Sequence, residues 1–225
     1  MIAIIAAMDS EVNAITNIME HTEKTTVSGI SITRGLISGK KVIVMKSGVG
    51  KVNASMSTTI LLENFVIEKI INIGTAGGLK KEQEILDAVI SNRVVQHDFD
   101  TSPIDGKDGI GLYFDADEEL CNTCEKVFEE MDVRAHVGLV ATGDQFIADE
   151  EKLERLESLF PEAICAEMEA GAIASVATHY HVPFVVLRSL SDIAHRDDSH
   201  MDFLTYVEHA AARSAVFCKE VMKFL

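Results

Sequence analysis

The stretch that decides the fold runs from Ala163 to Asp192 and reads AICAEMEAGAIASVATHYHVPFVVLRSLSD. Its first part is a short apolar run that ends in two acids, Glu167 and Glu169. From Met168 to Tyr180, apolar residues recur at steps of three and four, which is typical of one face of a helix. The last part, Phe184 to Leu187, is continuously apolar, as expected for a strand buried on both faces. We therefore predict a strand–helix–strand unit whose two strands are parallel.

Polar side chains follow both predicted strands. Glu167 and Glu169 follow the first, and Arg188, Ser191 and Asp192 follow the second. In open α/β sheets, ligands bind outside the carboxyl ends of the strands, so we expect these side chains to line a site. Either glutamate alone could instead simply favour a helix N-terminus, where negative charge gains about 0.3–1 kcal/mol. Arg188 follows four core residues and needs a buried partner.

The composition is that of an ordinary soluble globular protein, for which we predict a single domain over residues 1–225. The chain is 47% hydrophobic and carries 20 basic against 36 acidic residues, a net charge of −16. Because nucleic-acid binders normally carry the opposite sign, we expect no nucleic-acid partner. No apolar run approaches the length of a membrane span, and no leader precedes the first strand, so we expect a cytoplasmic protein without membrane contact.

Two groups of residues have spacings that suggest metal or redox chemistry. Cys121 and Cys124 form a C-x-x-C pair, but no second pair or nearby histidine completes a zinc set, so we predict two ordinary thiols. His97-Asp98 and the segment from His195 to His200 also offer ligand types, but their spacing matches no known metal set. We therefore predict no metal site.

Polar, glycine-rich turns recur at the ends of the predicted strands, which favours one sheet that presents one site at its carboxyl edge. These turns lie at 7–11, 47–51, 74–78, 143–147, 166–169 and 188–192. Asp9 or Ser10 is expected to cap the first helix, which leaves Glu11 as either a surface acid or a site carboxylate. The turn at 47–51 lacks the spacing of a phosphate-binding loop, although its backbone N–H groups could face a ligand. By contrast, 99–114 shows no periodicity and is predicted to be the longest loop.

Several of these segments together resemble one known family. They are AMDSE at 7–11, SGVGKV at 47–52, NIGTAGG at 72–78, GDQFI at 143–147, EMEA at 167–170 and RSLSD at 188–192. In this order they are similar to the 5'-methylthioadenosine/S-adenosylhomocysteine nucleosidases over essentially the whole chain. The resemblance implies the phosphorylase/hydrolase-like α/β fold, a central twisted mixed β-sheet flanked by helices. It also implies a homodimer and cleavage of the adenine–ribose bond without a cofactor.

The resemblance also implies roles for the charged residues. Glu11 would be the base that positions and activates water, and Asp192 the acid that protonates adenine N7, with Ser191 orienting it. Glu167 and Arg188 would organise the water and Glu11. These residue types suit the chemistry, because the bond breaks through a cation-like sugar and adenine leaves poorly unless it is protonated.

The remaining roles concern the rest of the substrate. Met168 and Glu169 would hold the ribose, with Glu169 accepting its hydroxyls. Phe146, which on its own is either a packing residue or a platform for a flat ligand, would stack on adenine. The other residues implied to contact substrate are Thr75, Ala76 and Gly77 on the glycine-rich segment, Ile147 through its backbone, and Met8 and Phe203 around the 5' substituent.

The implied substrates are 5'-methylthioadenosine and S-adenosylhomocysteine, and we add 5'-deoxyadenosine; the implied pathway is methionine salvage. A segment near 99–113 would reach the partner's site, but 101–113 is shorter and richer in glycine than in the family, so the preferred 5' group is left open. The alternatives are a related nucleosidase such as futalosine hydrolase, a purine nucleoside phosphorylase, and a non-catalytic nucleoside-binding protein. A phosphorylase would hold phosphate with arginines, whereas this chain has Asn72 and the acid Glu11 in that neighbourhood.

Overall fold

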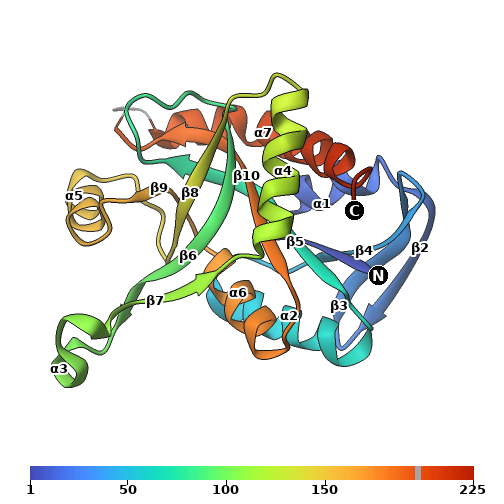
Figure 1. Cartoon of the computed structure of the whole chain (residues 1–225), viewed down its shortest axis with the longest axis horizontal. Coiled ribbons are helices and arrows are strands. Elements are labelled where there is room, and N and C mark those ends of the chain that lie inside the picture. Colours follow the sequence, from blue (N-terminus) through green and yellow to red (C-terminus); the bar gives the residue numbers. More distant parts are fainter. Residues whose placement is uncertain (196–198) are drawn as a thin grey trace.

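The structure is a computed structural model that describes residues 1–195 and 199–225, with the side chains of 199–202 excepted (Figure 1). It has the α/β fold that was predicted, a central mixed sheet flanked by helices. The strands are β1 (Ile2–Ala6), β2 (Glu20–Val27), β3 (Ile30–Ile37), β4 (Lys40–Lys46), β5 (Lys69–Gly78), β6 (Ala88–Asp100), β7 (Ile110–Asp115), β8 (Ala135–Thr142), β9 (Ala163–Glu167) and β10 (Phe184–Ile193). The helices are α1 (Asp9–Thr16), α2 (Lys51–Asn64), α3 (Ser102–Asp105), the 3₁₀ helix η1 (Gly106–Gly109), α4 (Glu118–Glu130), α5 (Glu150–Leu159), α6 (Ala170–His179) and α7 (Ser199–Val221).

The sheet curls until part of it closes on itself. Its strand order is β10-β6-β8-β9-β5-β1-β4-β3-β2, and an additional pairing of β10 with β5 joins strands on this path into a ring. β1 and β4 continue from β5 in parallel, and β2 and β3 complete the sheet as hairpins. Ser-Gly pairs between short strands predict hairpin turns at 28–29 and 38–39, and the turns lie there. All four residues have positive φ, as a two-residue turn between twisted strands requires.

The prediction that β9 and β10 are parallel is wrong. β10 runs parallel to β5, whereas β9 runs antiparallel to β5, so β9 and β10 have opposite directions. The apolar runs in the sequence indicate that β9 and β10 are both in the core. They do not indicate that β5 lies between the two strands. The carboxyl ends still converge, because β5 and β9 pair only through Gly77 with Ala166 and Gly78 with Cys165, near the end of each strand.

Apolar runs predict strands at 68–73 and 88–96, and both strands are longer than this. The predicted longest loop is ordered. β5 continues through the glycine-rich segment 74–78, and β6 continues through His97 and Asp98 to Asp100. The span 99–114 contains α3, η1 and most of β7, which pairs antiparallel with β6. Backbone pairing with β6 forms this arm despite the lack of side-chain periodicity, and Figure 1 shows the arm projecting from the body of the molecule.

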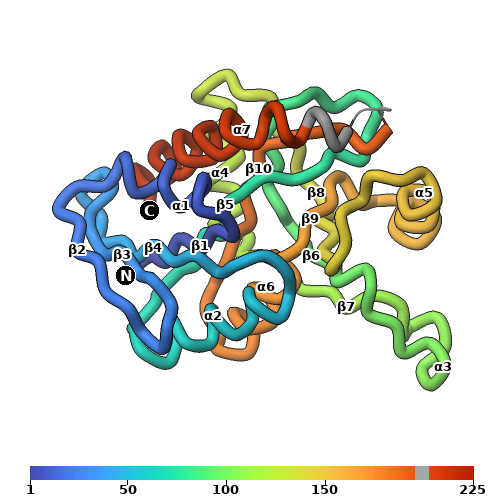
Figure 2. The backbone as a smooth tube through the Cα atoms, turned by 180° about the vertical axis from the view of Figure 1, so that it is seen from behind, coloured from blue at the N-terminus to red at the C-terminus, as the bar shows by residue number. Residues whose placement is uncertain are grey.

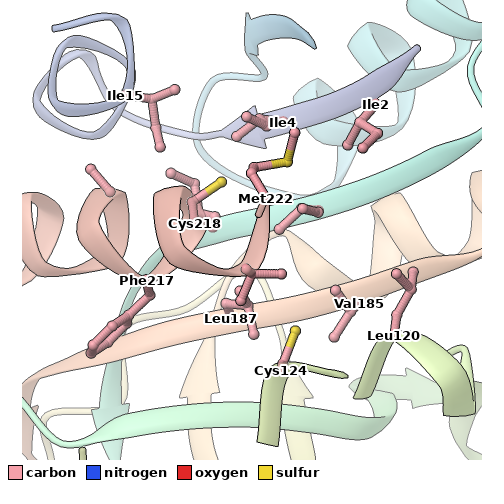
Figure 3. Packing of buried hydrophobic residues seen from close by; sticks show 14 of the residues in the cluster. Ile2, Ile4, Ile15, Leu120, Cys124, Val185, Leu187, Phe217, Cys218 and Met222 are labelled. Atoms are coloured by element: carbon pink, nitrogen blue, oxygen red, sulfur yellow. The ribbon is translucent and has the colours of Figure 1, made fainter. Parts of the chain in front are cut away.

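Helices cover both faces of the sheet (Figure 2). On one side, α7 and α4 pack over a cluster that includes Ile4, Leu187 and Phe217 (Figure 3). On the other side, α2 packs against α6 over a cluster that includes Ile5 and Val186. In the part of the chain that the structure describes, no helix is long and apolar enough to span a membrane.

The ends of the helices confirm some predictions and correct others. Asp149 precedes a charged helical segment and is predicted to cap it. It does cap α5, because its carboxylate accepts from the backbone N–H of Lys152 at 2.9 Å. Asp9 and Ser10 do not cap α1; they lie inside it, and Glu11 instead turns back to the backbone N–H groups at its start. The helical spacing of apolar residues from Phe203 to Phe224 predicts a final helix with Phe224 on its inner face. The prediction is wrong for Phe224, which lies beyond α7 and is 54% exposed.

Candidate active site

Every residue predicted for the site lines one cavity of about 240 Å³, at the carboxyl ends of β1, β5, β8, β9 and β10. These residues are Met8, Glu11, Thr75, Ala76, Gly77, Phe146, Ile147, Glu167, Met168, Glu169, Arg188, Ser191, Asp192 and Phe203. Parallel neighbours such as β1, β5 and β10 bring their last residues to the same edge, and β8 and β9 meet them there.

Glu11 is a carboxylate of the cavity rather than a surface acid. It is 2% exposed, although it lies in the first turn of α1. Its Oε2 accepts from the N–H groups of Ala7 at 3.0 Å and Met8 at 2.9 Å, and its Oε1 accepts from the N–H of Thr75 at 3.1 Å. Burial raises the pKa of Glu11, although these N–H groups and the charge of Arg188 oppose the rise.

Gly74 allows this close approach to β5. A Cβ at that position would lie 2.9 Å from Glu11 Oε1. The carboxylate can therefore rest on the strand only where the side chain is absent.

Arg188 is the buried guanidinium that needs a partner, and two side chains, those of Glu167 and Asn72, accept from it. It is 2% exposed, and its Nη2 donates to Glu167 Oε2 at 2.7 Å and to Asn72 Oδ1 at 2.6 Å. Burial disfavours its charge, but the charges of Glu167, Glu169 and Glu11 outweigh this cost, so the pKa of Arg188 lies above its ordinary value. Its Nε is buried and makes no hydrogen bond to the described residues.

Glu167 is held from four directions. Besides Arg188, it accepts from the backbone N–H groups of Glu169 at 3.0 Å and Ala170 at 2.8 Å, at the start of α6. The hydroxyl of Thr142 donates to its other oxygen. Glu167 therefore favours a helix N-terminus, as one interpretation had it, and also anchors the guanidinium of the site.

Glu169 links the site to the glycine turn at 47–51. Its Oε1 accepts from the N–H of Gly50 at 2.8 Å. This backbone N–H, which could have faced a ligand, therefore binds a carboxylate of the protein itself. The next N–H, that of Lys51, donates to Asp144 at 2.7 Å. Burial, followed by the nearby charge of Glu167, raises the pKa of Glu169 to about 8.

Asp192 lies farther along the same edge. It is 1% exposed, and Ser191 Oγ donates to its Oδ1 at 2.8 Å. A Cβ added at Gly77 would lie 3.0 Å from Asp192 Oδ2, so this carboxyl also rests against a glycine of β5. Gly74, beside Glu11, and Gly77, beside Asp192, are about 10 Å apart along the strand, at roughly 3.3 Å per residue.

The remaining wall of the cavity is mostly apolar. Phe146 is 38% exposed and its ring lies 5.4 Å from that of Phe203, with the two rings nearly perpendicular. Met8 and Met168 line the same cavity. The site thus combines a charged floor at the strand ends with an apolar, partly open mouth, which suits a ligand with polar and apolar halves.

Comparisons with known proteins place the chain in a family. The family model of the phosphorylase superfamily matches residues 1–223. A relative from Bacillus cereus (strain G9842), named 5'-methylthioadenosine/S-adenosylhomocysteine nucleosidase, is 41% identical over 229 residues, which cover 100% of this chain and 99% of the relative. The chain belongs to the 5'-methylthioadenosine/S-adenosylhomocysteine nucleosidase family. The resemblance inferred from its motifs is thereby confirmed.

Solved structures of the nucleosidase family are close to this one throughout. The nucleosidase from Neisseria meningitidis, in complex with methylthio-immucillin-A, has a TM-score of 0.94 and 30% identity, and the match covers 100% of this chain and 99% of that one. The futalosine hydrolase of Helicobacter pylori has a TM-score of 0.93 and 31% identity, with coverage of 100% and 97%. The backbone therefore does not separate these two kinds of nucleosidase.

Sequence reasoning missed some residues of this nucleosidase-family site. Thr142 and Asn72 contribute buried hydrogen bonds to Glu167 and Arg188, and Val49 and Gln145 line the cavity. Asn72, Val49 and Gln145 lie within the quoted motifs, which was a usable signal. Thr142 is the last residue of β8, directly before the Gly143 motif, and nothing in its type points to a buried carboxylate.

The groups considered for metal chemistry do not form a cluster. Among the side chains of residues 1–195 and 203–225, no group of three or more His, Cys, Asp or Glu is placed to hold a metal ion. His195 Nε2 lies 2.9 Å from Glu157, whereas the side chain of His200 lies outside the described residues. Cys121 and Cys124 are free and buried on α4, as predicted for ordinary thiols.

Proposed function

We propose that this protein hydrolyses the N-glycosidic bond of 5'-methylthioadenosine and S-adenosylhomocysteine, with 5'-deoxyadenosine as a further substrate. The observation that carries the proposal is the pair of buried carboxyl groups, Glu11 over Gly74 and Asp192 over Gly77. The two glycines lie about 10 Å apart along β5, which leaves room for a ribosyl group and a water molecule between the carboxyl groups that rest on them. The family to which the chain belongs supports the choice of substrate.

The reaction needs a nucleophilic water on one face of the sugar and a proton for the departing base. Glu11 takes a proton from water as the water oxygen attacks the anomeric carbon. Asp192 delivers a proton to N7, so that adenine leaves as a neutral molecule. The negative charges of the floor stabilise the cation-like sugar in the transition state.

Arg188 and Glu167 organise the water side of the site. The guanidinium carbon lies 3.6 Å from the position a Cβ would take at Gly74, beside Glu11. Because Arg188 Nε is buried and without a partner among the described residues, a water molecule there would satisfy it and lie near Glu11. Glu167 fixes the guanidinium in this orientation.

The apolar side of the cavity suits the rest of the substrate. The ring of Phe146 stacks on adenine, and the backbone of Ile147 contacts the edge of the base. Glu169 and Met168 hold the ribose, and Thr75, Ala76 and Gly77 let the backbone approach it. Met8 and Phe203 surround the 5' substituent.

The alternatives are disfavoured by particular residues. Arg188 is the one basic side chain among the described residues that line the cavity, and it is engaged by Glu167 and Asn72. A phosphorylase would need cationic groups to bind phosphate. The carboxylate of Glu11 would repel the phosphate. A non-catalytic binder would have no use for two carboxyl groups kept in a buried site at a desolvation cost.

The test is a panel of 5'-substituted adenosines, with futalosine included, in phosphate-free buffer that contains a chelator. We expect adenine to be released from 5'-methylthioadenosine as fast in this buffer as in one with phosphate and without the chelator. A strict phosphate requirement, with a ribose 1-phosphate as product, would show a phosphorylase. Release of base from futalosine alone would identify the other nucleosidase activity.

We also infer a homodimer in which the arm 99–113 reaches the neighbour's site. The arm projects from the body and carries Ile104, which is 87% exposed, and Phe99, which is 37% exposed. Exposed apolar side chains on a projecting segment are typical of an interface. Light scattering that finds a fully active monomer would contradict this inference.

We further propose that the enzyme works in the cytoplasm, in methionine salvage. Its cysteines are all free and buried, which fits a reducing compartment. Deletion of the gene should then cause 5'-methylthioadenosine to accumulate inside cells, and unchanged levels would argue against this role.

A further inference from the structure

β10 contains a bulge immediately before Asp192. Leu190 pairs with Ala76 of β5 and Asp192 pairs with Gly77, so Ser191 is an extra residue without a partner in the register. A bulge of this kind reverses the faces to which the following side chains point.

The core shows the effect of this reversal. Val186, Leu190 and Ile193 all pack in the same apolar cluster. Ile193 is three positions after Leu190, an odd step, so a regular strand would place the two side chains on opposite faces. Without the bulge, the side chain of Asp192 would enter this cluster and Ile193 would face the ligand cavity. The bulge therefore decides that Asp192 reaches the cavity.

A turn from the other neighbour of β10 holds the bulge in place. The antiparallel pairing with β6 ends at Ser189 and Ala88. Beyond it, Leu190 donates its N–H to the carbonyl of Asp87 at 2.9 Å and accepts from the N–H of Leu86 at 2.7 Å. Leu86 has φ 72°, a left-handed conformation that is unfavourable for a leucine and persists only when its surroundings impose it.

The carboxylate of Asp87 supplies that constraint. It is buried, and its Oδ2 accepts from the N–H of Glu84 at 3.0 Å, which closes the turn. The same oxygen lies 2.8 Å from Nε2 of His136 and 3.5 Å from Nε of Arg134. The turn is thus tied to the start of β8 as well as to β10.

We propose that Asp87 is a positioning residue for the acid of the reaction. It holds the turn 84–87, the turn holds Leu190, and Leu190 fixes the bulge that aims Asp192 at the leaving base. The inference rests on the proposed function, because it assigns Asp87 a part in the protonation step and gives it no contact with substrate.

The test compares two substrates that share a 5'-methylthio group. In 5'-methylthioadenosine the base must be protonated, whereas in the matching nitrophenyl riboside the leaving group departs without a proton. Asp87→Ala should lower kcat for 5'-methylthioadenosine by about 10–100-fold, because misplacing a reacting group by about 1 Å can cost about 100-fold. Its kcat for the nitrophenyl riboside should change by less than about threefold, and KM for both substrates should stay near that of the unsubstituted enzyme.

Asp87→Asn provides a second variant, which keeps an oxygen for the N–H of Glu84 and gives up the charge. The ratio of kcat for 5'-methylthioadenosine to kcat for the nitrophenyl riboside should fall by about threefold in this variant. Asp87→Asn provides the test if Asp87→Ala does not fold. Asp117→Ala is the matched control, since Asp117 likewise accepts from a backbone N–H, that of Leu120, at the start of α4. The control should leave the ratio of the two rates unchanged.

Equal losses on both substrates, or a ratio that matches the Asp117→Ala control, would overturn the proposal and reduce Asp87 to a structural residue. If the unsubstituted enzyme cleaves neither substrate, the proposed function fails first. The two failures are thus distinguishable.

Discussion

Thr142 offers a sharp test of how the site is held, because its hydroxyl makes two buried hydrogen bonds. It donates to the carboxylate of Glu167 and accepts from the N–H of Gly171 at 2.8 Å, and the residue is fully buried. Thr142→Val keeps the shape of the side chain and removes both bonds. The perturbation therefore isolates hydrogen bonding from packing.

The expected cost follows from the two groups left behind. Losing a hydrogen bond to a charged group costs about 1.5–3 kcal/mol, and leaving a buried N–H without a partner costs about 1–3 kcal/mol. Allowing for partial relaxation, we expect the free energy of unfolding to fall by about 3 kcal/mol. Since 1 kcal/mol corresponds to about 2–4 °C in a chain of this size, Tm should fall by about 6–12 °C.

Thr142→Ser is the matched control. It keeps the hydroxyl and removes one methyl group, which should cost about 1 kcal/mol. Thermal unfolding by circular dichroism measures both variants, and adenine release at 25 °C measures activity where both are folded. We expect kcat to fall by about tenfold in Thr142→Val and to stay nearly unchanged in Thr142→Ser, because Glu167 then keeps Arg188 in place. If the two variants lose equal stability and equal activity, the hydroxyl does not anchor Glu167 and the reasoning is refuted.

The remaining predictions concern the carboxyl groups of the cavity. Asp192→Asn should still bind a substrate analogue but lose about 10²–10⁴-fold in kcat on 5'-methylthioadenosine, with far less effect on a nitrophenyl riboside; near-normal turnover would show that Asp192 is not the acid. Glu11→Gln should slow both substrates alike by about 10²–10⁴-fold, since each needs activated water, and a selective effect on one of them would contradict its assignment as the base. Glu169 has a raised pKa of about 8 in the folded protein, so its contribution to stability is present below the ordinary value of 4.5 and is lost as the pH rises through about 8. The Tm of the unsubstituted protein should therefore fall relative to that of Glu169→Gln between pH 4.5 and 8, and parallel pH profiles for the two proteins would exclude this titration.

Part of the fold could be read from local patterns alone. Residues next to each other in sequence predict the hairpin turns at Ser28-Gly29 and Ser38-Gly39 and the cap at Asp149. The helical spacing of apolar residues likewise predicts the helix from Glu118. The convergence of polar side chains at the strand ends was also predictable, because it needs only that several strands end at one edge of a sheet.

Other features depended on which distant segments pair. The opposite directions of β9 and β10, and the arm that contains β7, follow from hydrogen bonds to β5 and β6, which no local periodicity records. The burial of Glu11 was likewise open in the sequence. A glutamate in a first turn is equally compatible with solvent, and only the placement of α1 against Gly74 removes it from water.

The sequence by itself determined the kinds of groups in the site, since its motifs carry the carboxylates, the guanidinium and the glycines in fixed order. The tertiary structure decided the direction in which these side chains point. The bulge at Ser191 turns Asp192 from an apolar cluster to the cavity, and Thr142 fixes Glu167 from another strand. The physical reason is that a side chain's chemistry is local, whereas its direction and desolvation are set by backbone and side-chain groups far away in the chain.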